Sequence, residues 1–579
     1  MGVERFSAGW AGMAAIAMVA SPVPAAASYP DVVRQSLYVP VRDGTRLAVN
    51  IYRPARGEAA ESARLPVIFV FTPYRARIRA ADGKVVEAGL SDHLALRSLI
   101  RAGYVVAVAD IRGKGASFGA RRGFQDRTEA QDGYDLVQWL AAQPFATGKV
   151  GMVGCSYLGG TVFHTASTTP PALKAVFIGA SDIDKYSFVR RGGITAQFNT
   201  RPDEPLSEDL ASLPVDADSD GSLLRTAVAE HAANTPMAAL WYSMPYRDSV
   251  SPLTGNAFWD EAAVYKYIPA IRRAGIATYV WGNWRDEPTA HTLFTAASLG
   301  SRALLGPGDH CMPPKGFDFT GELVRYFDHH LKGADNGFAA QPRVTAWVDE
   351  GDGKGRWIRS NRLPGTASRA LSWYPAGGRS GTARSANDGL LAARPGKAGA
   401  DSFRIDYNLP PADYFAFWAR PMDAHGLSYT GPALGKALHL SGFPVLHLSV
   451  STDRTDAPVF AYLDQVDPRG EAEVIAFGRL LLSHRKTGKA PFNTLGTPWH
   501  SGRSADVSPV TPGRPVSLSL ALTPISRVVQ PGYRLRLTIT GADPRQRNLK
   551  DLRQEPPPVI TVHRGKGTRI DLPVERHSK

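Results

Sequence analysis

The fold is decided by the stretch KVGMVGCSYLGGTVFHTAST, residues 149–168. An apolar, strand-like run precedes Ser156, a helical pattern follows it, and glycines stand on both sides of the serine. This strand–turn–helix order is typical of a nucleophile elbow, in which a sharp turn lifts the serine side chain above a sheet. Leu158 occupies the position of the usual second glycine, and Gly159 follows one step later. The stretch therefore predicts a nucleophilic serine in an α/β fold, with a purely structural serine as the alternative.

Short apolar strands alternate with helical segments on both sides of that stretch, from about residue 35 to residue 335. Strand patterns occur in LPVIFVFTP, YVVAVADIRG, LKAVFIGAS and IATYVWG, and helical patterns in SDHLALRSLIRAG and EAQDGYDLVQWLAAQ. Such alternation produces crossover units and a mostly parallel sheet, so we assign residues 28–340 to an α/β catalytic domain. Two helical patterns, SLLRTAVAEHAANTPMAALWY and FWDEAAVYKYIPAIRRAG, interrupt the alternation in the interval of about residues 183–265. We expect this interval to form a helical cap over the carboxyl edge of the sheet, where ligands bind in such folds.

The pattern of the chain changes after about residue 340. Segments such as VTAWVDE, VFAYLDQVD, VSLSLAL and YRLRLTIT are strand-like, lie between turns rich in Gly, Pro and Asp, and include no long helical pattern. Many short strands with frequent turns are typical of an all-β sandwich or jelly roll. Residues 341–579 are therefore predicted to form a second, β-rich domain.

Composition and charge exclude several classes of protein. Of the 579 residues, 43% are hydrophobic and 21% are charged, which describes a folded globular protein. The net charge of +14 comes from Lys and Arg spread along the chain, without the basic patches of a nucleic-acid binder. Residues 1–27 have the layout of a secretory signal peptide, with an apolar core too short to span a bilayer; an uncleaved membrane anchor is the alternative. We expect export to the periplasm or the medium, with no integral membrane segment after signal removal.

Two polar residues further along the chain complete a pattern with Ser156. Asp286 follows the strand-like IATYVWG, and His310 follows the strand-like RALLGPG. Serine hydrolases of α/β type place the nucleophile, the acid and the histidine in this chain order, and the carboxylate fixes the imidazole tautomer. The rival carboxylates are Asp309 and Glu287. Taken separately, Asp286 could instead cap a helix, and His310 could be an ordinary loop histidine.

A set of motifs carries a resemblance to a known family. They are VPVRDGTRLAVNIYRP, TPYR, ADIRGKGASFG, GMVGCSYLGG, WGNWRDEP, LLGPGDH, YFDHHLKG, SGFPVLHLSVSTD and YLDQVDPRGEAEVIAFGRLLLSHR. Together they resemble the serine hydrolases of the cocaine-esterase, X-prolyl dipeptidyl-peptidase and glutaryl acylase group, over nearly the whole chain after the signal. The resemblance implies an α/β-hydrolase domain with a helical cap, followed by a C-terminal jelly roll that helps to wall the active site.

The resemblance also implies roles for particular residues. Ser156 is the nucleophile, Asp286 the acid and His310 the base. The hydroxyl of Tyr74 and the backbone N–H of Tyr157 form the oxyanion hole, where two fixed donors meet the charge that develops on the carbonyl oxygen. Acyl transfer then passes through a covalent acyl-enzyme, with no metal and no organic cofactor. For Tyr74, a core aromatic after a strand is the alternative.

The residues after Asp286 narrow the substrate. Relatives that hydrolyse α-amino acid esters are expected to carry further carboxylates there to hold the ammonium group, whereas this chain continues with Glu287, Pro288, Thr289 and Ala290. That departure favours an ester over an amino-acyl amide. An aromatic-tolerant acyl pocket could be lined by four residues that are equally well explained as ordinary core aromatics: Trp241, Tyr242, Trp281 and Trp284.

The two cysteines of the chain, Cys155 and Cys311, directly adjoin the expected nucleophile and base. If Ser156 and His310 form a hydrogen bond, their chain neighbours can approach the roughly 4.4–6.8 Å between Cα atoms that a disulfide requires. The order Cys-Ser, Asp, His-Cys also resembles a local motif of the tannase and feruloyl-esterase group, in which such a bridge is a family feature. We therefore predict a Cys155–Cys311 disulfide, with two buried free thiols as the alternative.

These features predict an exported serine hydrolase that cleaves small-molecule carboxylic esters. The nearest alternative is an acylase or X-prolyl dipeptidyl-peptidase that cleaves amides with the same residues. A second alternative is an envelope- or carbohydrate-binding protein with a degenerate hydrolase domain, although an intact set of Ser, Asp and His argues against it. The sequence leaves the acyl group, the leaving group and a homo-oligomeric state open.

Overall fold

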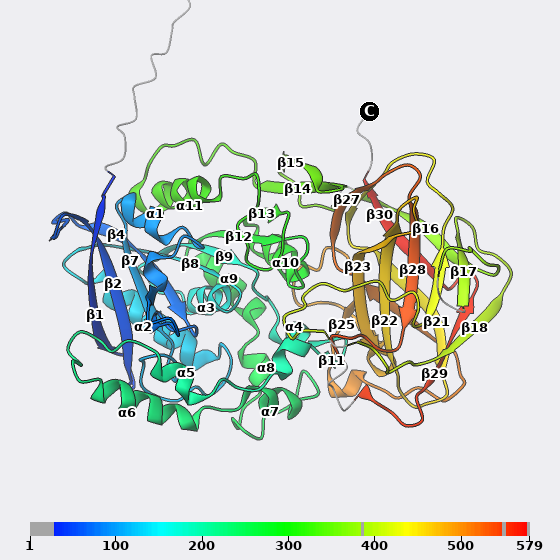
Figure 1. The fold of residues 1–579 in the computed structure, drawn as a ribbon, viewed down its shortest axis with the longest axis horizontal. Helices are drawn as coiled ribbons and strands as arrows, with labels where there is room; N and C mark the ends of the chain where they lie inside the picture. The colour runs from blue at the N-terminus through cyan, green and yellow to red at the C-terminus, as the bar shows by residue number, and fades with distance from the viewer. Residues whose placement is uncertain (1–27, 367, 384–386, 411, 547–551, 576–579) are drawn as a thin grey trace, which may run out of the picture.

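The protein is described by a computed structural model over residues 28–366, 368–383, 387–410, 412–546 and 552–575. The predicted signal peptide, residues 1–27, lies outside the described residues. Figure 1 shows two halves, one of mixed helices and strands from the N-terminal part of the chain and one of strands from the rest. In the described part of the chain, no helix has both the length and the apolarity needed to cross a bilayer.

The first half is built on a long, mostly parallel sheet with the strand order β1–β2–β7–β4–β8–β9–β12–β13–β14–β15. The pairs β1–β2, β2–β7 and β14–β15 are antiparallel, and the others are parallel. The bounds are β1 (Asp31–Pro40), β2 (Arg46–Arg56), β4 (Leu65–Thr72), β7 (Val105–Asp110), β8 (Ala146–Cys155), β9 (Leu173–Gly179), β12 (Ala277–Asn283), β13 (Arg302–Gly306), β14 (Val344–Gly351) and β15 (Lys354–Ser360). The predicted α/β class is confirmed.

Helices cover both faces of this sheet, because successive strand residues point to opposite sides. In β4, Val67, Phe69 and Phe71 join one apolar cluster, whereas Ile68 and Val70 join the other. The first cluster includes side chains of α2 (Arg127–Ala141), α3 (Tyr157–Ala166), α9 (Ile268–Arg273) and α10 (Thr289–Leu299). The second includes side chains of α1 (Leu96–Arg101) and α11 (Phe319–Phe327). The sheet is therefore buried on both faces, as its continuous apolar strands require.

The interval expected to form the cap contains short helices in place of the two long ones predicted. They are α4 (Lys185–Val189), α5 (Leu206–Leu210), α6 (Ser222–Glu230), α7 (Met237–Tyr242) and α8 (Phe258–Glu261), and Figure 1 shows α5 to α8 along the lower part of the first half. The first predicted helix is divided into α6 and α7 at Pro236, which precedes α7 and has no N–H with which to continue a helix. The second is divided between α8 and α9, because Pro269 lies in the first turn of α9.

The second half is a β-sandwich, which confirms the predicted β-rich domain type. One sheet contains β18 (Gly399–Arg404), β20 (Leu438–Gly442), β21 (Val445–Thr452), β26 (Val516–Ala521), β27 (Ile525–Val529), β29 (Val559–Arg564) and β30 (Arg569–Glu575). The other contains β17 (Asn387–Ala392), β19 (Leu427–Thr430), β22 (Pro458–Val466), β23 (Ala472–Leu481) and β28 (Arg534–Thr540), and β16 (Ser368–Ala376) pairs with both sheets. Their inner faces share one apolar core.

Several short strands complete the fold. They are β3 (Ala59–Ala60), β5 (Arg77–Arg79), β6 (Val85–Glu87), β10 (Arg190–Arg191), β11 (Ile194–Thr195), β24 (Thr487–Gly488) and β25 (Trp499–His500). The two halves are joined directly where β14 pairs with β27 through Asp349 and Arg527.

Candidate active site

Ser156 occupies the turn between β8 and α3, with φ 60° and ψ −126°. A residue with a side chain rarely adopts this backbone conformation, which costs on the order of 1–3 kcal/mol and persists where the surrounding fold enforces it. A Cβ atom added at Gly154 would lie 2.3 Å from the carbonyl oxygen of Leu158, and one added at Gly159 would lie 2.1 Å from that of Gly179 in β9. The displaced second glycine is therefore needed for close packing of α3 on the sheet.

Asp286 and His310 meet above the carboxyl ends of β12 and β13. The Nδ1 atom of His310 lies 2.9 Å from each carboxylate oxygen of Asp286, which is only 1% exposed. Burial raises the pKa of Asp286. Burial alone would lower the pKa of His310, but the charge and hydrogen bond of Asp286 outweigh it and raise that pKa above its ordinary value. The pair thus favours a charged imidazole, with Nε2 left for proton transfer.

A disulfide joins the elbow to the histidine loop. The structure contains the Cys155–Cys311 bond that the sequence predicts, with 5.8 Å between the two Cα atoms. Each cysteine is the direct chain neighbour of a site residue, Ser156 or His310, and both of these line the same cavity. The bond therefore limits how far the serine and the histidine can move apart.

Tyr74 and Tyr157 lie beside Ser156. Their rings are 6.3 Å apart, edge to face. The hydroxyl of Tyr74 interacts with the side chain of Ser156 and the backbone of Tyr157; desolvation of this hydroxyl raises its pKa more than these contacts lower it. Because Tyr157 is the first residue of α3, its N–H has no partner within the helix. A neutral hydroxyl and an N–H that the helix does not use thus lie next to the serine.

A buried polar network, which no sequence motif indicates, holds Tyr157 in place. Its hydroxyl donates to Glu129 Oε2 at 2.7 Å, and its carbonyl accepts from Gln125 Nε2 at 2.8 Å. Gln125 in turn accepts from Lys185 Nζ at 2.5 Å. Burial raises the pKa of Glu129 to about 8. These residues are far apart in sequence, so only the tertiary fold reveals their function of fixing Tyr157.

Ser156, Tyr74 and His310 line a cavity of about 590 Å³, which we call the catalytic cavity. Its aromatic walls come from both halves of the molecule: Phe124, Phe188, Phe198, Phe415 and Phe417. The ring of Phe417, from the β-rich half, lies 4.5 Å from that of His310. The cavity therefore offers an apolar site directly above the serine.

The predicted aromatic pocket is largely wrong. Trp281 is fully buried on the α11 side of the sheet, and Trp284 is a core residue that donates to the carbonyl of Trp347 at 2.8 Å. Tyr242 lines a separate small cavity against the β-rich half. Trp241 is 1% exposed and reaches only the chamber described next. Most of these aromatic side chains therefore pack in the core or line other cavities, and do not line the catalytic cavity.

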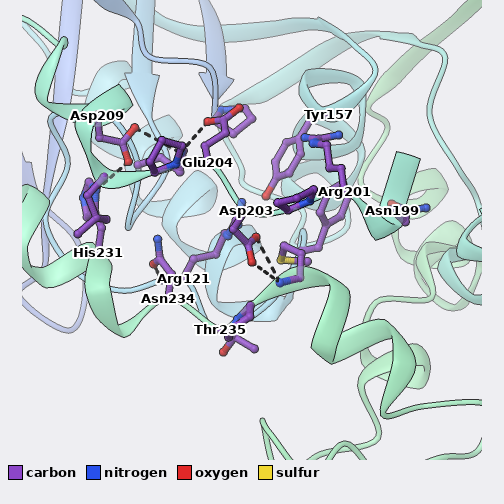
Figure 2. A pocket seen from close by; sticks show the side chains of 18 of the residues that line it. Arg121, Tyr157, Asn199, Arg201, Asp203, Glu204, Asp209, His231, Asn234 and Thr235 are labelled. Carbon is purple, nitrogen blue, oxygen red and sulfur yellow. Dashed lines mark hydrogen bonds and ion pairs between the residues drawn. The ribbon is translucent and has the colours of Figure 1, made fainter. Parts of the chain in front are cut away.

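A second chamber of about 340 Å³ adjoins the catalytic cavity and shares Tyr74, Tyr157 and Arg201 with it. We call it the arginine chamber, because Arg121 and Arg201 line it. Figure 2 shows a polar wall, and the labelled residues besides Tyr157 and the two arginines are Asn199, Asp203, Glu204, Asp209, His231, Asn234 and Thr235. Sequence analysis identified none of these polar residues, since they lie in loops and cap segments without a motif.

Glu287 points away from the catalytic cavity into a buried arginine cluster. Its carboxylate lies 2.5 Å from Arg191, 3.3 Å from Arg479 and 3.2 Å from Arg545. Burial would raise the pKa of Glu287, but these three cations lower it. The nearest acidic residue after Asp286 is therefore already neutralised. In the described ranges, no group of three or more His, Cys, Asp or Glu side chains could hold a metal ion.

Comparison with known proteins decides the family. The model of the X-Pro dipeptidyl-peptidase (S15) family matches residues 43–312, and that of the X-Pro dipeptidyl-peptidase C-terminal non-catalytic domain matches residues 336–565. The chain belongs to the S15 family of serine hydrolases. This confirms the resemblance that the motifs indicate.

Relatives of this S15 hydrolase align over most of its length. It is 29% identical to a Mycobacterium bovis protein named as a candidate serine esterase, over 93% of this chain and 95% of that protein. It is 24% identical to the cocaine esterase of a Rhodococcus species, over 88% of this chain and 91% of that enzyme. The crystal structure of a CocE/NonD family hydrolase from Staphylococcus aureus superposes with a TM-score of 0.70 at 19% identity, covering 94% of each chain, and confirms the fold.

Proposed function

We propose that this S15 hydrolase cleaves carboxylic esters through Ser156, His310 and Asp286. The observation that carries the proposal is the arrangement at the elbow: a serine in an enforced backbone conformation lines one cavity with an Asp286-paired histidine and with the hydroxyl of Tyr74. Each group that acyl transfer requires is thus present in one place.

The reaction then proceeds in two halves. His310 takes the proton of Ser156 as its Oγ attacks the ester carbonyl, and the oxyanion is met by the Tyr74 hydroxyl and the Tyr157 N–H. His310 next donates that proton to the leaving alcohol, which departs and leaves an acyl-serine. Water then reacts in the same way. His310 takes a proton from the water molecule, the hydroxide attacks the acyl carbon, and the proton returns to Ser156 as the carboxylic acid leaves.

An ester is favoured over an amide by the state of Glu287. The ion pairs with three arginines leave this carboxylate unable to anchor the ammonium group of an amino-terminal substrate. Amide cleavage by the same three residues, as in an acylase or X-prolyl dipeptidyl-peptidase, is the second candidate, because both matching family models carry the X-Pro dipeptidyl-peptidase name.

We further propose that the protein is exported, to the periplasm or the medium. The disulfide between Cys155 and Cys311 supports this, because such bonds persist in oxidising compartments. We also keep the proposed division into a catalytic domain, residues 28–340 with the cap at 183–265, and a β-rich domain, residues 341–579. The strands β14 and β15, which follow residue 340, extend the sheet of the catalytic domain.

Labelling with a fluorophosphonate probe, mapped by mass spectrometry, tests the proposal. We expect the probe on Ser156 and no labelling in Ser156→Ala. Turnover of phenyl acetate should exceed that of acetanilide, the matching amide, and should be lost in the same variant. Faster turnover of the anilide would favour the amide-directed alternative. Absence of labelling in the folded, oxidised protein would favour a binding protein with a degenerate hydrolase domain.

A further inference from the structure

The acidic side chains of the arginine chamber are already engaged. Glu204 lies 3.0 Å from both Arg75 and Lys114, and Asp209 lies 3.4 Å from Arg75 and 3.3 Å from Lys114. Asp203 accepts the first N–H of α7 with both of its oxygens, at 3.2 and 3.3 Å. The dashed lines in Figure 2 mark interactions of Asp203, Glu204 and Asp209 with other residues of the chamber. The acceptors in its wall therefore have partners within the protein.

Some hydrogen-bond donors of the chamber, in contrast, lack partners among the described residues. Within the part of the chain that the structure describes, Arg121 and Arg201 form no ion pair with a carboxylate, and the Nε atom of Arg121 is buried without a hydrogen-bond partner. The guanidinium of Arg201 lies 5.2 Å from the ring of Phe415 and donates to the carbonyl oxygen of Phe198 at 3.5 Å. Asn199 is 7% exposed, lines both cavities, and its Nδ2 atom also lacks a partner.

The charges of the chamber side chains, counted together with Arg75 beside them, also have a positive sum. Arg75 and Lys114 are matched by Glu204 and Asp209, which leaves two arginines against the single carboxylate of Asp203. Partly buried cations and donors without partners cost free energy that an anionic, acceptor-rich ligand would recover. Guanidinium groups suit carboxylates in particular, since their fork of donors binds both oxygens.

Resting on the proposed ester hydrolysis, we propose that the arginine chamber binds a carboxylate of the substrate, so that the preferred esters are anionic. Arg201 is the main specificity-determining residue, with Arg121 and Asn199 as further donors. Its position fits this function: Arg201 lines both cavities, and its charge acts on the hydroxyl of Tyr74. An ester whose carbonyl meets Tyr74 can therefore place a carboxylate beyond it, while its apolar part fills the catalytic cavity.

Two matched pairs of esters test the proposal. Monophenyl adipate against phenyl adipamate places the charge on the acyl side, and 4-acetoxybenzoate against 4-acetoxybenzamide places it on the alcohol side. For at least one pair we expect kcat/KM of the anion to exceed that of its neutral amide about 10–100-fold, the range for a hydrogen bond to a charged group. The ratio should fall toward one in Arg201→Gln, fall further with Arg121→Gln added, and survive in part in Arg201→Lys. Arg359→Gln, an exposed arginine of β15 outside both cavities, is the matched control.

Binding of the same esters to Ser156→Ala, measured by titration calorimetry, separates this proposal from the proposed reaction. Tighter binding of the anionic ester, lost when Arg201→Gln is added, supports the chamber even if no ester is turned over. Equal binding and equal kcat/KM within both pairs would overturn the chamber while ester hydrolysis stands. A preference for the anion that Arg201→Gln and the double variant both retain would also overturn it.

Discussion

At the scale of the residue, the pKa of His310 results from two opposing causes, and this makes the pH dependence of the reaction testable. Burial lowers this pKa, whereas Asp286 raises it above 6.5. A general base must be neutral, so activity should fall as the pH drops through the raised pKa. In Asp286→Asn the raising cause is removed and burial remains. The acidic limb of the kcat/KM profile should then move to lower pH, with kcat reduced by about 10⁴-fold; an unmoved limb would contradict the pairing.

The hydroxyl of Tyr74 is a second feature that can be tested by removing one oxygen atom. Tyr74 is 48% exposed, so its ring contributes less to the core than a buried tyrosine would. Tyr74→Phe should lower kcat about 10²–10³-fold, the usual cost of one oxyanion donor, with a much smaller change in KM. Tyr246→Phe, at an exposed cap position, is the control for loss of a hydroxyl. Steady-state kinetics that show a changed KM alone would indicate a role in ground-state binding instead.

At the scale of the element, the disulfide connects the end of β8 with the loop after β13. It closes a segment of 156 residues, for which the chain-entropy estimate of stabilisation is about 5 kcal/mol. Dithiothreitol should therefore lower both the melting temperature and kcat of the wild-type protein. The double variant Cys155→Ala with Cys311→Ala should have the melting temperature and kcat of the reduced protein, and dithiothreitol should change neither value. A reduced wild type with full activity would show that the bond is not needed to align Ser156 with His310.

Elements differ in how far the sequence predicts them. The elbow is predictable because its requirements are local: Gly154 and Gly159 leave space that a Cβ would fill. The long cap helices are predicted wrongly because apolar periodicity continues through Pro236, where the helix cannot. The prediction that Trp281 lines an acyl pocket is also wrong. Trp281 lies two residues after Tyr279 in β12, so both side chains point to the same face of the sheet, where they join one apolar cluster.

At the scale of the whole molecule, Glu287 joins the two halves beside Asp286, the proposed acid. Arg479 and Arg545 come from the β-rich half, and Glu287 directly follows Asp286. Glu287→Gln leaves buried arginines with one fewer carboxylate, and we expect a loss of about 3–5 kcal/mol in the free energy of unfolding, together with a lower kcat. Urea denaturation and kinetics check this. Glu350→Gln, which breaks an exposed ion pair with Arg356, should cost less than about 1 kcal/mol.

The cavities are the part of the molecule that sequence patterns predict least. The residue order that indicates Ser156, Asp286 and His310 follows the strand order of the sheet, so it can be read along the chain. The walls of the catalytic cavity do not follow that order. Phe188 and Phe198 come from the cap interval and Phe415 and Phe417 from the β-rich half, and no periodicity relates them. The cap brings Phe188 and Phe198 to the cavity, and the docking of the two halves brings Phe415 and Phe417.

The position of Phe417 against His310 has a consequence for how such enzymes diversify. The proposed reacting groups belong to one half of the molecule, whereas this ring and its neighbour Phe415 belong to a loop of the other half. Substitutions in that loop can alter which molecules are admitted while every group that makes or breaks a bond keeps its own scaffold. Part of the cavity wall can thus change independently of the half that carries Ser156, Asp286 and His310.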